Sequence, residues 1–198
     1  AGILFYAAGL LLNDWADAAV DRIERPDRPV PAGLVSRGAV LTAGLVCTLV
    51  ALLLCLLAGR FPFQVGLALA VAIGSYNLLA KNLPVVGAAN MGICRGLNLL
   101  LGAALAAGPE IPVLAWWGAG TVTAYIAAVT HLARREMVGR YGAVERWLPA
   151  AVLAGAFLLY LPLSPLIEWP GQVAVAVLFA VAATGAARCA RALPNKRG

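Results

Sequence analysis

The sequence predicts an all-α fold, a polytopic bundle of transmembrane helices. Hydrophobic residues make up 62% of the 198 residues and charged residues only 12%, a balance that is unusual for a protein folded in water. Six apolar stretches each approach the ~20 residues that a helix needs to cross a bilayer. They are 39–58, 63–80, 85–107, 112–133, 147–167 and 171–190.

A seventh apolar stretch, 1–12, is too short to span a bilayer. It carries no positively charged leader, so we expect the C-terminal part of a transmembrane helix rather than a signal peptide. The longest polar stretch, about 13–38, has the length of a loop between two spans. We therefore predict one membrane domain over 1–198, continued in a longer protein at both ends.

The basic residues predict the orientation in the membrane. Of the 15 Lys and Arg residues, 13 fall on one side of the predicted bundle, and the positive-inside rule assigns that side to the cytoplasm. We expect an integral protein of the bacterial plasma membrane whose acidic loop faces the cytoplasm. Scattered basic residues without interleaved aromatics exclude a nucleic-acid surface. The 13 residues are Arg22, Arg25, Arg28, Arg37, Lys81, Arg134, Arg135, Arg140, Arg146, Arg188, Arg191, Lys196 and Arg197.

Three carboxylates follow the first apolar stretch at helical spacing. Asp14, Asp17 and Asp21 are three and four residues apart, which places them within roughly 60° of one another on a helix surface. Like charges on one face repel, and a cluster of oxygen ligands suits Mg²⁺, which shares its coordination with phosphate oxygens. The cluster predicts a magnesium–diphosphate site, and the alternative is a solvated acidic loop.

A proline- and arginine-rich segment follows the carboxylates. Pro26, Pro29 and Pro31 remove backbone donors and end the helix. We expect an extended strap that holds Arg25 and Arg28 beside the carboxylates, where a guanidinium can bind phosphate through two hydrogen bonds. The alternative role for either arginine is to set topology only.

These motifs resemble those of the UbiA-type intramembrane prenyltransferases. The run 13–33 resembles the family's first motif, NDxxDxxxD followed by a Pro- and Arg-rich strap, and Tyr76 with Lys81 resembles a later Tyr…Lys element. The segment 90–98 is similar to a subgroup that includes EboC proteins. The resemblance implies about nine helices, of which this chain covers seven, and Mg²⁺-dependent transfer of an isoprenyl group from an isoprenyl diphosphate to an aromatic or lipid acceptor.

The segment where the family carries a second aspartate-rich motif departs from the pattern. Residues 130–140 contain no aspartate, and only Glu136 offers a carboxylate. Arg134 and Arg135 can replace a metal there, because arginine and Mg²⁺ both stabilise a phosphate-bearing leaving group. The departure leaves two alternatives to an enzyme open: an isoprenoid or lipid carrier that has lost turnover, and a transporter.

Inside a predicted span, Arg95 requires a polar environment, since a charge near the bilayer centre costs about 2.5–3.5 kcal/mol. Asn98 shares its helix face, so the pair is expected to line a cavity, with a structural arginine as the alternative. Gly92 and Gly96 have a small-xxx-small spacing that favours close helix packing.

Together these arguments predict a functional site. As catalytic residues we expect Asp14, Asp17, Asp21, Lys81 and Glu136, with the four carboxylates among them binding Mg²⁺. As substrate-binding residues we expect Asn13, Arg25, Arg28, Tyr76, Lys81, Arg95, Asn98, Arg134 and Arg135.

Overall fold

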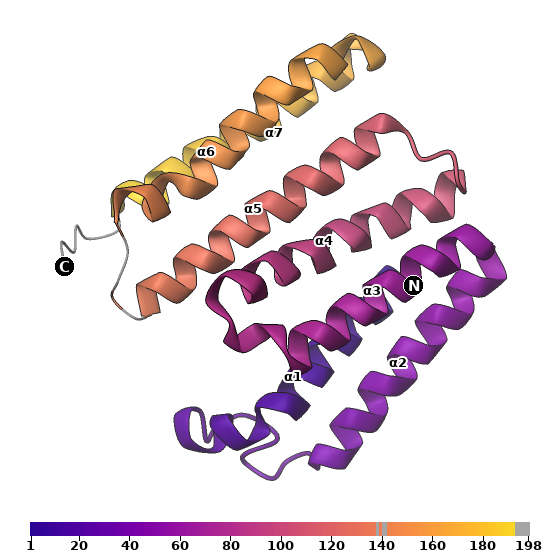
Figure 1. The fold of residues 1–198 in the computed structure, drawn as a ribbon, viewed down its shortest axis with the longest axis vertical. Helices are drawn as coiled ribbons and strands as arrows, with labels where there is room; N and C mark the ends of the chain where they lie inside the picture. The colour runs from indigo at the N-terminus through magenta and orange to yellow at the C-terminus, as the bar shows by residue number, and fades with distance from the viewer. Residues whose placement is uncertain (138, 140–141, 193–198) are drawn as a thin grey trace. The chain divides into compact units, whose positions relative to one another are not determined.

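The computed structural model describes residues 1–137, 139 and 142–192, and these residues are helical apart from their connections, as predicted (Figure 1). Arg140, Lys196 and Arg197, which entered the orientation argument, lie outside the described residues. The elements are α1 (Gly2–Glu24), α2 (Arg37–Ala58), α3 (Arg60–Leu78), η1 (Ala80–Asn82), α4 (Pro84–Ala107), α5 (Val113–Met137), α6 (Ala143–Tyr160), η2 (Leu161–Leu166) and α7 (Trp169–Ala192).

Helix α1 corrects the expectation that the first apolar stretch is too short to span. The helix does not stop at Leu12 but runs for 23 residues to Glu24, and all three carboxylates lie within it. The acidic motif is therefore a continuation of an apolar helix rather than a loop after it. Because consecutive i→i−4 hydrogen bonds cost little once a helix has started, three charged residues do not end it, whereas Pro26 does.

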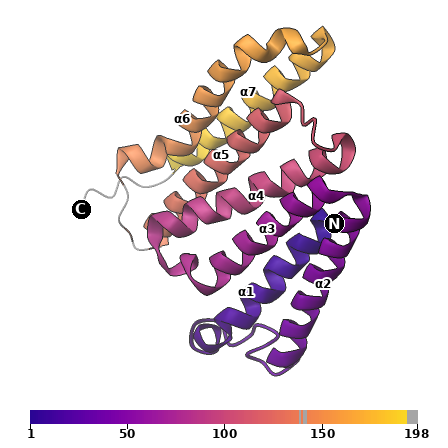
Figure 2. The same ribbon diagram turned by 45° about the vertical axis from the view of Figure 1, so that its right-hand side comes forward.

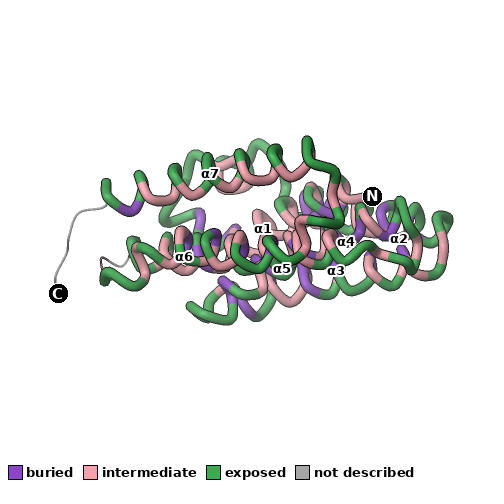
Figure 3. The backbone as a smooth tube through the Cα atoms, turned by 90° about the horizontal axis from the view of Figure 1, so that it is seen from above, coloured by how far each residue is buried: buried purple, intermediate pink, exposed green. Residues whose placement is uncertain are grey.

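The apolar helices leave much of their hydrophobic surface uncovered. Leu49, Leu57 and Val71 are 65%, 75% and 64% exposed, and Figure 3 shows exposed residues, in green, on every helix. Within the described residues, seven helical segments are long and apolar enough to cross a membrane. Side chains of this kind are stable in lipid and not in water, and helices satisfy their backbone polar groups internally. The chain is an integral membrane protein.

The helices divide into two compact units, which are described separately. The first unit contains residues 1–83 and 97–115, with α1, α2 and α3 side by side (Figure 2). Glycines allow close approach here: a Cβ on Gly44 of α2 would stand 3.1 Å from Leu12 of α1, and one on Gly66 of α3 would stand 3.0 Å from Cys55 Sγ. Close contact between these three helices fixes the acidic end of α1 against the end of α3.

The second unit contains residues 84–96 and the described residues from Trp116 onward. In it, a Cβ on Gly92 or Gly96 of α4 would stand 2.2 Å from Thr123 O and 2.0 Å from Thr123 Oγ1 of α5, respectively. The predicted packing role of these two glycines is confirmed. Only hydrogen at these positions lets the two helices come so close.

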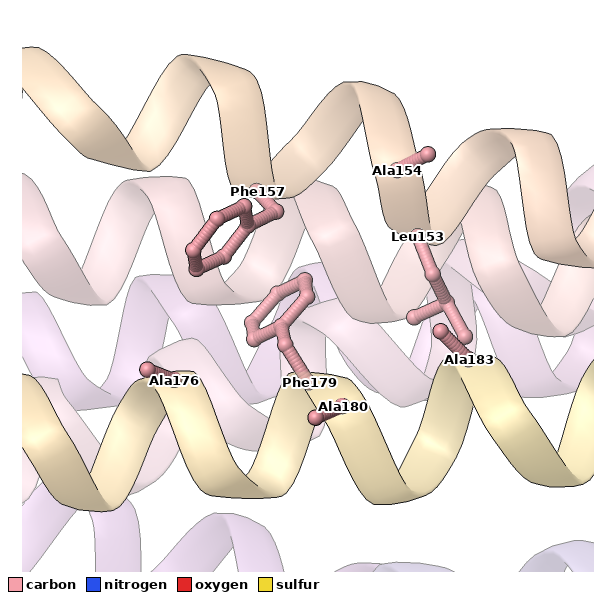
Figure 4. Close-up of a pocket in the computed structure, with 7 residues that line it drawn as sticks. All are labelled: Leu153, Ala154, Phe157, Ala176, Phe179, Ala180 and Ala183. Carbon is pink, nitrogen blue, oxygen red and sulfur yellow. The ribbon is translucent and has the colours of Figure 1, made fainter.

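Helices α6 and α7 pack together in the second unit around aromatic side chains. Phe157 and Phe179 have ring centroids 5.7 Å apart, and Trp117 of α5 lies 5.3 Å from the Tyr160 ring. A groove of about 190 Å³ between α6 and α7 is lined by side chains of both helices (Figure 4). Its lining is apolar: Leu153, Ala154, Phe157, Ala176, Phe179, Ala180 and Ala183.

Candidate active site

The last three turns of α1 present the three carboxylates at different depths. The Asp21 side chain is 9% exposed, Asp17 28% and Asp14 46%. A carboxylate that is nine-tenths buried is costly unless it is paired or hydrogen-bonded. The partner of each carboxylate therefore decides what the site can do.

Arg28 joins two of these carboxylates. Its Nη1 atom lies 2.8 Å from Asp21 Oδ2 and 3.5 Å from Asp14 Oδ1. Residues seven positions apart are separated by about two helical turns and lie on the same face of the helix, so one nitrogen can reach both carboxylates. The contact confirms that Asp14 and Asp21 share a face of α1 and that Arg28 lies beside them.

Lys81 neutralises the third carboxylate. The residue belongs to η1, directly after α3, and its Nζ atom donates a hydrogen bond to Asp17 Oδ1. The Lys81 side chain is 15% exposed, so its charge is largely removed from water. The structure thus brings Arg28 to Asp14 and Asp21, and Lys81 to Asp17 from 64 residues away in the sequence, in agreement with the predicted placement of both cations beside the carboxylates.

The strap between α1 and α2 has a different backbone from the expected one. It is not extended but folds into consecutive turns, in which Ala32 N donates to Arg28 O at 2.8 Å and Leu34 N donates to Pro29 O at 3.0 Å. The prolines lack donors, but their carbonyl oxygens still accept. Gly33 closes the turns with φ +74°, a conformation that side chains disfavour.

A second arginine fixes the far end of the strap. The Nε atom of Arg37, the first residue of α2, donates to Trp15 O at 3.1 Å, and its guanidinium lies 5.1 Å from the centroid of the Trp15 ring. The cation–π contact and the hydrogen bond both hold the Arg37 side chain against Trp15. Both ends of the strap are therefore attached to the acidic end of α1, which orients Arg28.

The charge and the donor set of the site fit a metal–diphosphate ligand. Three carboxylates and two cations leave one formal negative charge. Among the described residues, no group of three acidic, His or Cys side chains is arranged as a metal site: Asp14 and Asp21 form one pair on Arg28, and Asp17 is separate. Mg²⁺ takes only one or two protein carboxylates and fills its octahedron with water and phosphate oxygens, so this pair suffices.

Several predicted residues lie near the site and form no hydrogen bond or ion pair with the carboxylates among the described residues. Arg25 is exposed at the C-cap of α1, while Asn13 in α1 and Tyr76 in α3 are half-buried. Asn98 is placed elsewhere: a Cβ on Gly2 would stand 2.8 Å from its Oδ1 atom. Gly2 is twelve residues before Asp14, or about 18 Å along the helix. The structure therefore places Asn98 at the other end of α1.

The remaining predicted residues belong to the second unit. Arg95 is half-buried in α4, and Arg134 is half-buried near the end of α5. Arg135 Nη2 lies 3.8 Å from Glu145 Oε1, and Glu136 is exposed.

Glu145 was missed by the sequence analysis. Its Oε2 atom accepts a hydrogen bond from Gly142 N at 2.9 Å, so it caps the start of α6. The sequence signal that could have identified it is a glutamate three residues after Gly142, at the start of an apolar run, which is typical of a helix N-terminus. Glu145 adds a carboxylate beside Arg135 in the region that lacks aspartate.

Comparison with known proteins assigns the chain to a family. Residues 1–197 match the family model described as the UbiA prenyltransferase family. The chain belongs to the UbiA prenyltransferase family. This assignment covers both compact units and agrees with the acidic motif on α1. No solved structure matches the chain.

Curated members of the UbiA family show what such chains are similar to. A digeranylgeranylglyceryl phosphate synthase of Methanoregula boonei is 34% identical over 131 residues, 66% of this chain and 44% of the relative. Synthases of the same name from Haloquadratum walsbyi and Methanothrix thermoacetophila are 34% and 32% identical, over 70% and 69% of this chain and 46% and 48% of their own. The chain spans about half the length of these relatives.

Proposed function

We propose that the protein is an intramembrane prenyltransferase that transfers an isoprenyl group from an isoprenyl diphosphate to the hydroxyl group of a membrane lipid. The observation that carries the proposal is the arrangement of Asp14, Asp21 and Arg28 with Asp17 and Lys81 at the polar end of a transmembrane helix. Carboxylates and cations alternate there over a short distance. Such an arrangement suits a diphosphate and its counterions and has no evident use in a purely apolar lipid site.

Asp14 and Asp21 would hold Mg²⁺, with Asp17 beside them. The metal would act as a Lewis acid that draws negative charge onto the diphosphate oxygens. Arg28, released from the carboxylates, has the geometry to bind phosphate oxygens through two hydrogen bonds. Lys81 supplies a second positive charge. The carboxylates orient these groups before the substrate arrives, so little reorganisation is needed.

The reaction breaks the bond between C1 of the allylic chain and the diphosphate oxygen, and the bonding electrons leave with the diphosphate. The lipid hydroxyl oxygen forms a new bond to C1, and its proton passes to the released diphosphate. The products are a prenyl ether and hydrogen diphosphate. The lipid-embedded helices exclude water from this step, which prevents hydrolysis of the developing carbocation.

The relatives support a lipid acceptor over an aromatic one. The three named relatives are synthases of digeranylgeranylglyceryl phosphate, a glyceryl phosphate with two isoprenoid groups. We infer that the acceptor here is of the same class, a glyceryl phosphate lipid with one prenyl chain and a free hydroxyl. The similarity of the segment 90–98 to EboC proteins, the bacterial plasma membrane and the cytoplasmic orientation of α1's acidic end remain our predictions.

The end of α5 is proposed as a second phosphate-binding element. Arg134 and Arg135 supply positive charge where the family carries carboxylates, and Arg95, half-buried in α4, is a further cation of the same compact unit. Glu136 and Glu145 are the carboxylates of this element. Because Arg135 lies 3.8 Å from Glu145, its guanidinium is held near the start of α6 until an anion competes for it.

The proposal is tested with the full-length protein in liposomes, supplied with radiolabelled geranylgeranyl diphosphate, Mg²⁺ and a singly prenylated glyceryl phosphate. We expect a doubly prenylated product whose formation requires Mg²⁺. Binding of the diphosphate without product would favour the carrier alternative. Flux across sealed vesicles would favour a transporter, and absence of both binding and product would refute the proposal.

The second element is tested by Arg135→Ala. We expect weaker binding of inorganic diphosphate, with only partial rescue in Arg135→Lys, since a lysine has no bidentate fork. Isothermal titration measures the affinity. Unchanged diphosphate affinity in an Arg134→Ala/Arg135→Ala double variant would exclude a phosphate role for both residues.

A further inference from the structure

Among the described residues, one buried polar atom near the acidic site has no hydrogen-bond partner. Asn77, in the last turn of α3, is 4% exposed, and its Oδ1 atom makes no hydrogen bond. A buried carbonyl oxygen without a donor costs about as much as a lost hydrogen bond, so such groups in folded proteins call for an explanation.

The orientation of the Asn77 amide is determined by its other end. Nδ2 donates to Ile73 O at 3.0 Å. A backbone carbonyl can only accept, so the nitrogen and not the oxygen must face Ile73. The free atom of Asn77 is therefore an acceptor, and it is complementary to a ligand that donates. A diphosphate, which offers only acceptor oxygens when ionised, does not meet this requirement.

The register between α1 and α3 places Asn77 relative to the carboxylates. A Cβ on Gly9 would stand 3.8 Å from Ile73 Cγ2, and Asp17 is bonded to Lys81. The two helices run in the same direction and both contacts join residues 64 positions apart, so interpolation between them pairs Asn13 with Asn77. Both amides thus lie one helical turn, about 5–6 Å, deeper in the membrane than the Asp17–Lys81 pair.

In the proposed reaction, the reacting groups meet at this level. When the diphosphate is held by the carboxylates and the prenyl chain extends into the apolar interior, C1 of the chain lies just beneath the diphosphate. The nucleophile must approach C1 at the same depth. Lys81, four residues after Asn77, already donates a hydrogen bond to Asp17. A hydroxyl group is the neutral donor that the proposed acceptor lipid brings to this level.

We propose that Asn77 Oδ1 accepts a hydrogen bond from the acceptor's hydroxyl group and positions the nucleophilic oxygen beneath the diphosphate. Asn77 takes no proton; it orients the O–H bond and selects alcohols over acceptors without a donor. The inference rests on the proposed function and adds the residue that determines acceptor specificity. The same interpolation places Asn13 of α1 at this level.

The melting temperature of Asn77 variants distinguishes a binding role from a structural role, because the two roles predict changes of opposite sign. Ile73 O already accepts the α-helical bond from Asn77 N, so Asn77→Leu leaves no orphaned group and removes an unsatisfied one. We expect the melting temperature of Asn77→Leu to equal or exceed that of the wild type. A purely structural asparagine would instead lose stability when replaced.

The decisive experiment compares two ligands in each protein. A singly prenylated glyceryl phosphate and its O-methyl ether differ only in the hydroxyl donor. The wild type in nanodiscs should bind the free-hydroxyl lipid about tenfold more tightly, whereas Asn77→Leu should bind both within about twofold. KM for the acceptor should rise about tenfold with KM for geranylgeranyl diphosphate nearly unchanged.

Thr48→Val is the matched control. Like Asn77 Nδ2, Thr48 Oγ1 donates a hydrogen bond to the backbone carbonyl four residues earlier, Gly44 O at 2.9 Å, but Thr48 belongs to α2 rather than α3. It should keep the wild-type discrimination. Persistent discrimination in Asn77→Leu would overturn the inference, because the hydroxyl group must then be recognised by another group. If Asn77→Leu does not fold, Asn77→Ala is compared in the same way, and failure of both would mark Asn77 as structural and overturn the inference. Absence of turnover in the wild type would instead refute the proposed function.

Discussion

Arg28 is predicted to compete with Mg²⁺ for the acidic site, and Arg28→Gln tests this. In the ligand-free protein the Arg28 guanidinium forms ion pairs with the carboxylates of Asp21 and Asp14. A metal ion must displace it, and displacement is favourable only when a diphosphate is present to receive the released arginine. The wild type should therefore bind Mg²⁺ alone weakly and bind it well together with diphosphate.

The size of the effect follows from the exposure of the partners. The contact to Asp14 is 3.5 Å long and its carboxylate is 46% exposed, so it contributes less than about 1 kcal/mol. The 2.8 Å bond to Asp21 involves a carboxylate that is 9% exposed and an arginine that is 33% exposed. A charge-assisted bond of this kind contributes about 2 kcal/mol, below the 3–5 kcal/mol of a fully buried pair. The melting temperature should fall by about 4–8 °C.

Thermal unfolding in detergent, followed by tryptophan fluorescence, measures both effects. Without ligand, Arg28→Gln should unfold earlier than the wild type. Addition of Mg²⁺ alone should then stabilise Arg28→Gln more than the wild type, because the two carboxylates are free. Arg25→Gln removes the same charge from an exposed strap position and should leave the melting temperature unchanged. Equal Mg²⁺-induced shifts in Arg28→Gln and wild type would refute the competition.

Two further predictions concern packing and charge pairing. Asp17→Asn should lower the free energy of unfolding by about 1–2 kcal/mol in chemical denaturation, because it leaves the mostly buried Lys81 ammonium without its carboxylate. The double variant Asp17→Asn/Lys81→Met should recover this stability. An unchanged free energy of unfolding in Asp17→Asn would contradict the pairing. Gly92→Ala should destabilise by about 1–3 kcal/mol, since its Cβ would stand 2.2 Å from Thr123 O. Gly102→Ala, with no atom within 4 Å, should be neutral in the same thermal assay.

Local patterns in the sequence were sufficient to predict the helices and the three aspartates that form one face of the site. Apolar length determines which segments span a bilayer, and a spacing of three and four residues determines that carboxylates share a helix face. Both depend on neighbours in the chain, so Asp14, Asp17 and Asp21 could be grouped without coordinates. The length of α1 was misjudged because hydrophobicity stops at Leu12 while backbone hydrogen bonding continues to Glu24.

Contacts between distant segments required the tertiary structure. The order of residues does not reveal that one arginine nitrogen joins Asp14 to Asp21 or that Lys81 reaches Asp17. It also does not reveal that Asn77 Oδ1 lacks a hydrogen-bond partner among the described residues. These relations depend on the strap's turns and on the register of α1 against α3, which glycines at the helix contacts set by permitting close approach. Composition and spacing determined where the charges are on each helix. Only packing decided which charges meet, because pairing depends on distances across helices that the spacing along one helix does not contain.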